Sequence, residues 1–286
     1  MPRQRNLATR FGTALGALCA VLLIAAQAHG SDHAGGLTEE FHQSYILAAG
    51  GRVALENING AVHISGWDKN EVQVDAVKYA NSKERLDDAT IRVTAGNNSV
   101  SIRTEYRERD NSWNSDGRDN PASVEYTLRV PRGARLDEIK LINGSLNIQG
   151  VSAAVRAACV NGRLTAHGLQ GPAELSNING RTEATFDRLG DSIELSSVNG
   201  GVALTLPSDS QAKVEASTVH GGIDNDFGLH VNHHRWVGHD LRGELGSGAT
   251  RIKLSNVNGG IEIRHASDGR QLSTPKDLIR RDSDDI

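Results

Sequence analysis

Apolar and polar residues alternate along most of this chain, in short runs that turn residues separate. In 71–77 and 124–130 every second side chain is apolar, and Pro131 ends the second run. Such alternation predicts β-strands with one face in solvent. The runs 91–93 and 99–103 flank Gly96 and predict a hairpin. Only residues 82–89 have helical character, with Ser82 at the capping position.

A short phrase recurs between these runs: a β-branched residue, then Asn, then Gly. It occupies 58–60, 142–144, 160–162, 178–180, 198–200 and 257–259, and His220 replaces Asn in 219–221. Asn-Gly adopts positive φ readily and marks a tight corner. Asn143, Asn161 and Asn179 are each 18 residues apart, and Asn199 follows 20 residues later. A period of about 20 residues is typical of a solenoid. We therefore predict an all-β parallel β-solenoid, or β-helix-like stack, with a less regular N-terminal β region.

Stacking should align equivalent residues in columns. We expect two buried stripes, one of the Ile or Val before each Asn and one of the apolar residue two positions after each Gly, with Thr182 interrupting the second. The Asn side chains should form a ladder that bonds backbone groups of the adjacent coil. If Leu195 and Val198 are both buried, strict alternation fails between them. We therefore expect a bend or bulge there, at a small polar position held by Asn57, Asn177, Ser197, Thr218 and Asn256.

The pattern also divides the chain. Residues 1–28 combine Arg3, Arg5 and Arg10 with an apolar run and the small residues Ala26 and Ala28, and they predict a cleaved signal peptide. A membrane anchor is the alternative, but the run is short for a span of about 20 residues. We expect a flexible leader at 29–40, an N-terminal β region at 41–135 with a mobile loop at 105–120, the solenoid at 136–265 with an insertion at 224–249, and a disordered tail at 266–286.

Composition agrees with thin stacked coils, because aromatic residues make up 4% of the chain and Gly occurs 31 times. The net charge of −4 gives no electrostatic case for nucleic-acid binding. After signal cleavage only Cys159 is left, so no internal disulfide can form. Cys159 lies two residues before Asn161, and we expect it to be a buried structural residue.

Histidine is dense near the C-terminal end of the repeats. His220, His230, His233, His234 and His239 lie within twenty residues, with Asp224, Asp226 and Asp240 nearby. These side chains suit zinc, copper or nickel. Their spacing matches no metal motif, and an exposed polar loop explains them equally well. We therefore predict no metal site and no cofactor.

Candidate catalytic groups are weak as well. Gly246-Ser247-Gly248 lacks the spacing of a nucleophile elbow. Glu183, Glu194, Glu215 and Glu262 occupy polar positions of strands, which a solvated strand face explains equally well. Trp67, Trp113 and Trp236 could stack on sugars but are scattered, and we expect Trp67 to cap one end of the core. We predict no catalytic residue.

Taken together, these motifs resemble the Toastrack family of bacterial adhesin-like proteins over about 41–263. The resemblance rests on 58–60 followed by 64–68, on 124–131, on the Asn-Gly repeats, and on 243–248 leading into 254–259. It implies a β-repeat protein outside the cytoplasmic membrane, in a family where some members are fused to membrane segments and linked to envelope-stress signalling. The family has no established catalytic residues. This sequence departs from those members in lacking a membrane anchor.

We therefore expect a non-catalytic extracytoplasmic β-repeat protein, an adhesin or a cell-envelope binding or scaffold protein, located in the periplasm or secreted. Its expected partner is an envelope protein or a surface polymer, without nucleic acid and without stable membrane insertion after signal cleavage. The alternative is a carbohydrate-active enzyme built on a β-solenoid.

Overall fold

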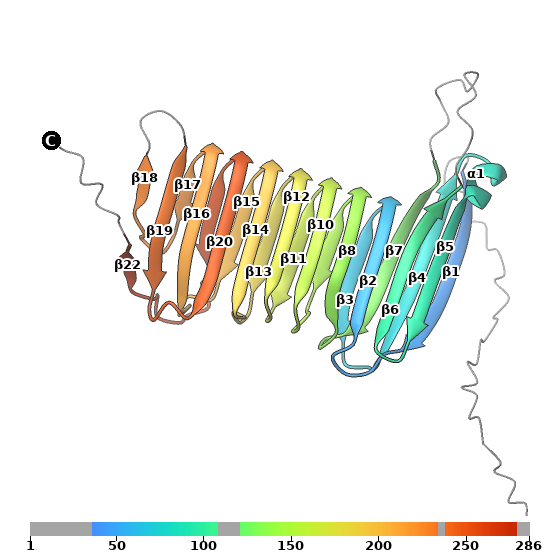
Figure 1. Cartoon of the computed structure of the whole chain (residues 1–286), viewed down its shortest axis with the longest axis horizontal. Helices are drawn as coiled ribbons and strands as arrows, with labels where there is room; N and C mark the ends of the chain where they lie inside the picture. The colour runs from blue at the N-terminus through green and yellow to red at the C-terminus, as the bar shows by residue number, and fades with distance from the viewer. Residues whose placement is uncertain (1–35, 108–120, 234–237, 279–286) are drawn as a thin grey trace, which may run out of the picture.

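The chain forms an elongated rod of two packed β-sheets in a computed structural model that describes residues 36–107, 121–233 and 238–278 (Figure 1). Sheet A contains, in spatial order, β1 (Leu37–Ile46), β4 (Glu71–Ala80), β7 (Ser123–Pro131), β3 (Val62–Trp67), β9 (Leu146–Gln149), β11 (Leu164–Leu169), β13 (Thr182–Phe186), β15 (Val202–Leu206), β21 (Ile261–His265) and β17 (Ile223–Asn225).

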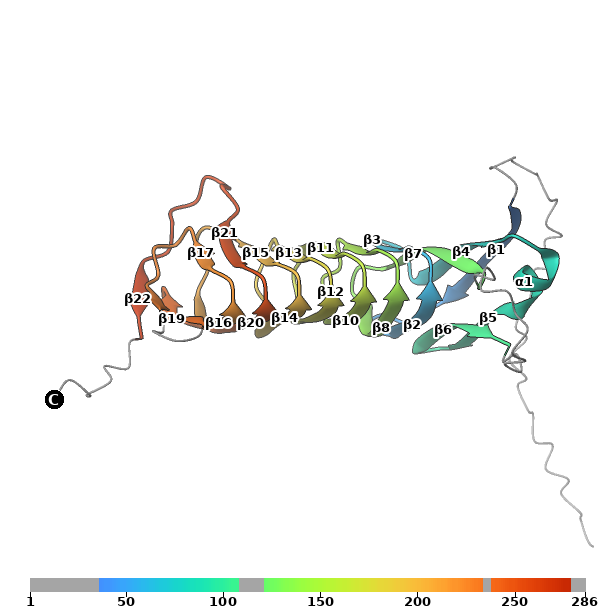
Figure 2. The same ribbon diagram turned by 90° about the horizontal axis from the view of Figure 1, so that it is seen from above.

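Sheet B lies against sheet A and runs the same way along the rod (Figure 2). Its spatial order is β18 (Val231–His233), β19 (His239–Leu245), β16 (Ala212–His220), β20 (Thr250–Asn258), β14 (Ser192–Asn199), β12 (Ala173–Asn179), β10 (Val155–Asn161), β8 (Arg135–Asn143), β2 (Arg52–Asn59), β6 (Ser99–Tyr106) and β5 (Ala89–Gly96). The short β22 (Pro275–Asp277) pairs with β19. The helix α1 (Lys83–Asp88) connects β4 to β5, and Ser82 caps it by accepting a hydrogen bond from the Arg85 amide at 3.3 Å.

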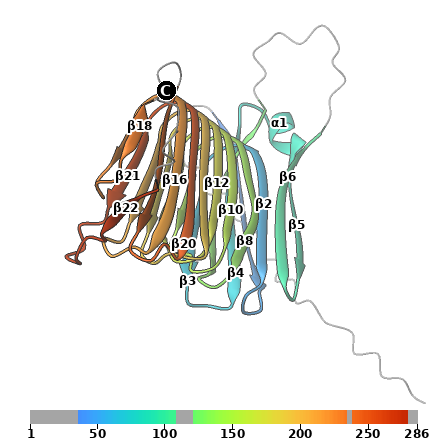
Figure 3. The ribbon, with the colours of Figure 1, turned by 60° about the vertical axis from the view of Figure 1, so that its left-hand side comes forward.

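Each Asn-Gly corner carries the chain from a strand of sheet B to a strand of sheet A, which makes one coil. Coils stack in parallel with matching register at the corners, so that Asn161 pairs with Asn179, and Asn179 with Asn199. Figure 3 shows β2, β8, β10 and β12 following one another in one layer. The predicted solenoid-like stack is confirmed, and the predicted hairpin is the antiparallel pair of β5 and β6.

The order of the coils in space differs from their order in the sequence. The last coil, β20 and β21, lies between the coil of β14 and β15 and the coil of β16 and β17. The expectation that successive units always lie on one another is therefore wrong at this end. The reason is that β19 pairs antiparallel with β16 on its outer side, which leaves the inner side of β16 for β20.

The N-terminal region continues the stack instead of forming a separate arrangement. The strands β2 and β3 form a coil with the same corner, and Asn59 pairs with Asn143. One layer further out, β6 and β7 pair in parallel with β2 and β3. Strands β4, β1 and β5 are then added antiparallel.

Both expected flexible segments contain some regular structure. Strand β1 begins at Leu37, inside the expected leader, and β22 lies inside the expected tail. In that tail Ser273 is buried and donates a hydrogen bond to the Ser210 carbonyl. The predicted signal peptide lies outside the described residues, as does most of the predicted 105–120 loop. In the described part of the chain no helix is long and apolar enough to cross a membrane.

The core lies between the sheets and consists of Val, Ile, Leu and Ala with few rings. The predicted stripe two residues after each Gly is buried, and Thr182 continues it with no exposed surface. The predicted stripe of Ile or Val before each Asn is not buried, which corrects that expectation. In β14, Leu195 and Ser197 point inward and Val198 points outward, so alternation holds and no bulge forms between them.

The inward position before each corner holds a polar side chain for a physical reason. Asn177 donates to the Gly162 carbonyl at 2.8 Å, and Asn256 donates to the Gly200 carbonyl at 2.6 Å. Ser197 and Thr218 make the same bond with their hydroxyl groups. Tight corners turn a carbonyl toward the interior, and this buried acceptor needs a donor.

Candidate binding surface

The outer face of sheet B carries side chains in straight rows, because the coils stack without a register shift along most of their length. The row farthest from the corners is charged and consists of Arg156, Glu174, Glu194, Lys253 and Glu215. The next row is small, with Ala158, Ser176, Ser196, Ser255 and Ser217. The third row, which we call the Ile/Val stripe, comprises Ile58, Ile142, Val160, Ile178, Val198, Val257 and Val219.

The Ile/Val stripe is a continuous exposed apolar surface. Six of its members are between 36% and 45% exposed, and Val160 is half-buried. A single exposed apolar residue needs no explanation, whereas a contiguous row of them does. Adjacent strands are about 4.8 Å apart, so the stripe presents one β-branched side chain per strand spacing along the rod.

Beside the stripe runs a ladder of Asn side chains, here called the Asn ladder. Its members are Asn59, Asn143, Asn161, Asn179, Asn199 and Asn258, and each amide nitrogen after the first donates to the preceding side-chain oxygen at 2.8–3.0 Å. We expected bonds to the backbone, and the inward polar residues make those instead. Each amide after Asn59 uses one of its two N–H groups for its neighbour, which leaves a second N–H group on the exposed side chain. His220 pairs with Asn258 and stands at the next position.

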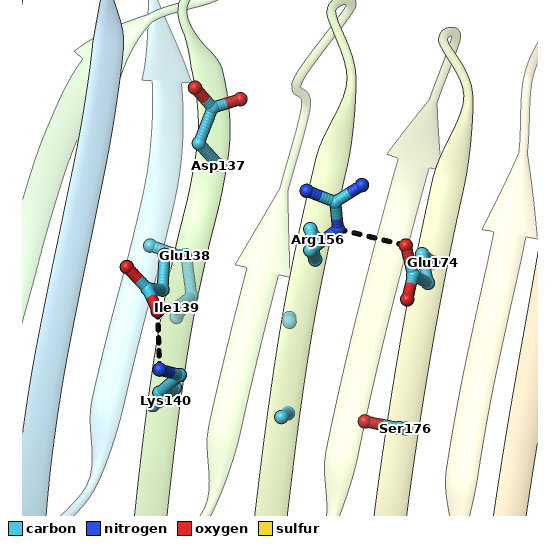
Figure 4. Close-up of a pocket in the computed structure, with 9 residues that line it drawn as sticks. Asp137, Glu138, Ile139, Lys140, Arg156, Glu174 and Ser176 are labelled. Carbon is cyan, nitrogen blue, oxygen red and sulfur yellow. Dashed lines mark hydrogen bonds and ion pairs between the residues drawn. The ribbon is translucent and has the colours of Figure 1, made fainter.

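A shallow depression of about 380 Å3 lies on the same face where β8 is irregular. The register of β8 against both neighbours shifts around Asp137, which is a β-bulge. Figure 4 shows Glu138 and Lys140 on one side and the ion pair of Arg156 with Glu174 on the other, the latter at 2.8 Å. The Lys140 ammonium beside Glu138 lowers the pKa of that carboxyl. The depression therefore holds charges that are already paired.

The four carboxylates considered for catalysis do not converge. Glu194 and Glu215 lie on the outer face of sheet B, and Lys253 stands between them, 2.6 Å from Glu194. Glu183 and Glu262 lie on the outer face of sheet A. Arg181 reaches over β15 to Glu262 at 3.1 Å, and its hydrogen bond lowers the pKa of Glu262.

The remaining candidates are also dispersed. Trp67 ends β3 and donates to the Glu71 carbonyl at 2.8 Å, while Trp113 and Trp236 lie outside the described residues. Cys159 is buried beneath its corner, where burial raises the pKa of its thiol.

Among the described residues, the histidines and aspartates of this segment do not form one cluster. His233 and His239 face each other across β18 and β19 with ring centres 4.6 Å apart. His230 is exposed, and its backbone amide donates to Asp277. Asp224 lies on β17 of sheet A and Asp226 on the turn after it. Asp240 lies on β19 of sheet B, where it accepts a hydrogen bond from Asn232 of the neighbouring β18. His234 lies outside the described residues. Where the chain is described, no three His, Cys, Asp or Glu side chains gather as metal ligands.

The chain belongs to the Toastrack family (DUF4097), whose model matches residues 48–264. No curated protein matches it. A Clostridium sporogenes structure, provisionally named a cell adhesion protein, is 12% identical, with a TM-score of 0.46 over 79% of this chain and 100% of that one. A Bacteroides fragilis structure, provisionally named an adhesin, is 11% identical, with a TM-score of 0.33 over 79% and 97%. A Parabacteroides distasonis structure, provisionally named a lipid binding protein, is 10% identical, with a TM-score of 0.30 over 81% and 94%.

The sequence contained the signal for the stripe, but we interpreted it wrongly. Alternation from the buried Leu195 assigns Val198 to the outer face, provided that Ser197 can be buried. We instead expected Val198 to be buried, with a bend at the small polar position before it. Only the hydrogen bonds to the corner carbonyls reveal why a polar residue belongs inside.

Proposed function

We propose that this protein is a non-catalytic extracytoplasmic binding protein of the cell envelope, with the Ile/Val stripe and the Asn ladder as its adhesive surface. The observation that carries the proposal is the stripe itself. Strand positions on a solvated face are normally polar. Here seven successive coils place a β-branched residue at the same outward position.

The arrangement suits an extended partner that lies along the rod. Most coils offer the same set of groups, an apolar side chain flanked by an amide and by a small residue. Contacts that repeat at the strand spacing of about 4.8 Å add their individually weak energies. A polymer of the cell surface, or an extended segment of an envelope protein, fits this geometry. The signal peptide predicted at 1–28 supports export to the periplasm or beyond.

The test compares binding by two sets of substitutions. In the first, Ile142→Ser, Ile178→Ser and Val198→Ser remove the apolar surface of three coils. In the control, Asn147→Ala, Thr165→Ala and Thr205→Ala change the outer face of sheet A instead. We expect capture of envelope proteins or of surface glycans on an array by the unaltered protein and the control, and loss of this capture in the stripe variant.

Equal capture by both variants would refute the role of the stripe. A carbohydrate-active enzyme is the alternative function, and no carboxylate pair described above favours it. Release of reducing sugars from envelope polysaccharides by the unaltered protein would decide for the enzyme and against the proposal.

A further inference from the structure

The two ends of the rod close the space between the sheets differently. At the C-terminal end Phe227 and Leu229 enter the core and are 1% and 4% exposed. Asn225 fixes the turn that carries them, because its side chain accepts a hydrogen bond from the Leu229 amide and donates one to the Leu229 carbonyl. Strands β17 and β18, which end the two sheets here, have three residues each. This end is a capped end.

The N-terminal end is only partly covered. Here β1 has ten residues and β5 has eight, and α1 lies between them (Figure 2). Lys78 holds α1 in place by donating to the carbonyls of Leu86 and Ala89. The helix has only six residues, and the inward side chains of the end strands stay half-buried: Phe41, Tyr45, Ile91 and Val93. Stacked-repeat proteins need their terminal apolar faces covered.

Strand β1 also has a free backbone edge. Among the described strands it pairs with β4 alone. The Leu47 amide, just beyond β1, donates to the Asn70 carbonyl at 3.1 Å, on the β4 side. Because hydrogen-bonded and non-hydrogen-bonded pairs alternate in an antiparallel ladder, the backbone groups of Glu40 and His42 point away from β4. They are donors and acceptors that another strand can use.

We propose that this end binds a second copy of the chain, with β1 pairing antiparallel to β1 of the second copy. The two-fold axis is perpendicular to the sheets and passes beside Phe41. In this register Glu40 of each chain lies opposite His42 of the other chain. The two Phe41 residues lie opposite each other. Opposite charges and aromatic pairs both stabilise cross-strand contacts. Shifting the axis to Glu40 would bring two carboxylates together, which disfavours that register.

The same axis also acts on sheet B. It places β5 beside its copy, so that both sheets continue from one molecule into the next. The half-buried side chains of the two ends then enclose one another and close the core. The result is a rod of twice the length with a capped end at each extremity. The Ile/Val stripe lies on another surface and stays accessible in this dimer.

The test measures mass and length together, by light scattering after size-exclusion chromatography and by small-angle X-ray scattering. We expect the protein to be a dimer with nearly twice the largest dimension of one chain. Glu40→Pro removes an outward N–H that β4 does not use, and edge strands tolerate proline. Phe41→Ser removes the ring at the axis. Both variants should be folded monomers of half that length, and His42→Glu, which sets two carboxylates opposite each other, should weaken the dimer as well.

Two controls keep the result specific. Leu272→Ser removes an exposed apolar residue outside this end, and Val198→Ser removes one from the stripe. Both should remain long dimers. The inference is overturned if the unaltered protein is monomeric at every concentration, if its dimer is no longer than one chain, or if Val198→Ser dissociates the dimer while Phe41→Ser does not.

Discussion

Replacing Gly200 by Val should destabilise the rod strongly, because Gly200 stands where two corners touch. Its backbone angle φ is +143°, which residues other than Gly rarely adopt. A Cβ atom at this position would lie 2.1 Å from the Gly180 carbonyl oxygen of the adjacent coil. That oxygen belongs to the backbone of the next coil and cannot turn away alone. The corners must therefore separate.

The magnitude follows from two contributions. A non-Gly residue in such a region costs about 1–3 kcal/mol. Separating the corners also weakens two backbone hydrogen bonds between these coils, from the Gly180 amide to the Asn199 carbonyl at 2.8 Å and from the Thr182 amide to the Gly201 carbonyl at 2.9 Å. Each contributes about 1 kcal/mol. The free energy of unfolding should fall by about 3–5 kcal/mol in total. For a chain of this size that lowers the melting temperature by on the order of 10 °C.

The assay is thermal and urea unfolding followed by circular dichroism, with Gly201→Val as the matched control. Gly201 is the next residue and has an ordinary φ. An added Cβ would meet only the guanidinium of the long Arg181 side chain at 3.3 Å and the Gly260 carbonyl oxygen at 3.6 Å. We expect a clearly smaller change there. Equal melting temperatures for the Gly200→Val and unaltered proteins would refute the view that corner glycines are required by contact between coils.

Three further outcomes test the account of the core and the charges. Thr182→Val should raise the melting temperature, because the Thr182 hydroxyl is fully buried without a hydrogen-bond partner and Val202 fills the same position one coil on. The free energy of unfolding should rise by about 1 kcal/mol. A lower melting temperature would show that the hydroxyl makes a stabilising hydrogen bond. Glu262→Gln should destabilise the protein at neutral pH by less than about 1 kcal/mol. Since Arg181 lowers the pKa of Glu262 below 4.5, its stabilisation is present above that pH and is lost as the pH falls through the lowered pKa, so the two proteins should unfold alike in strong acid; a difference independent of pH would contradict this. Cys159 should resist alkylation in the folded protein and react after unfolding, as a mass measurement would show, and rapid native labelling would contradict its burial.

The sequence by itself determined the coil and its corner. Each corner requires Gly at a backbone contact that repeats in every coil, so Gly200 and its equivalents appear at a near-constant period. The buried stripe after each corner could be predicted for the same reason, since period-two alternation from a known corner fixes which side chains face inward. The helix cap at Ser82 was likewise a local property of its neighbours.

Only the tertiary structure decided two other features. The coil of β20 and β21 lies inside the coil of β16 and β17, although it follows that coil in the sequence, because β19 pairs with the outer edge of β16. No local sequence pattern encodes a choice between the two edges of a strand. The outward direction of Val198 and its equivalents depended on hydrogen bonds between Asn177 or Ser197 and corner carbonyls of a neighbouring coil. Those bonds join residues that alternation alone cannot relate, and they turned the expected core stripe into the exposed surface from which the proposed function follows.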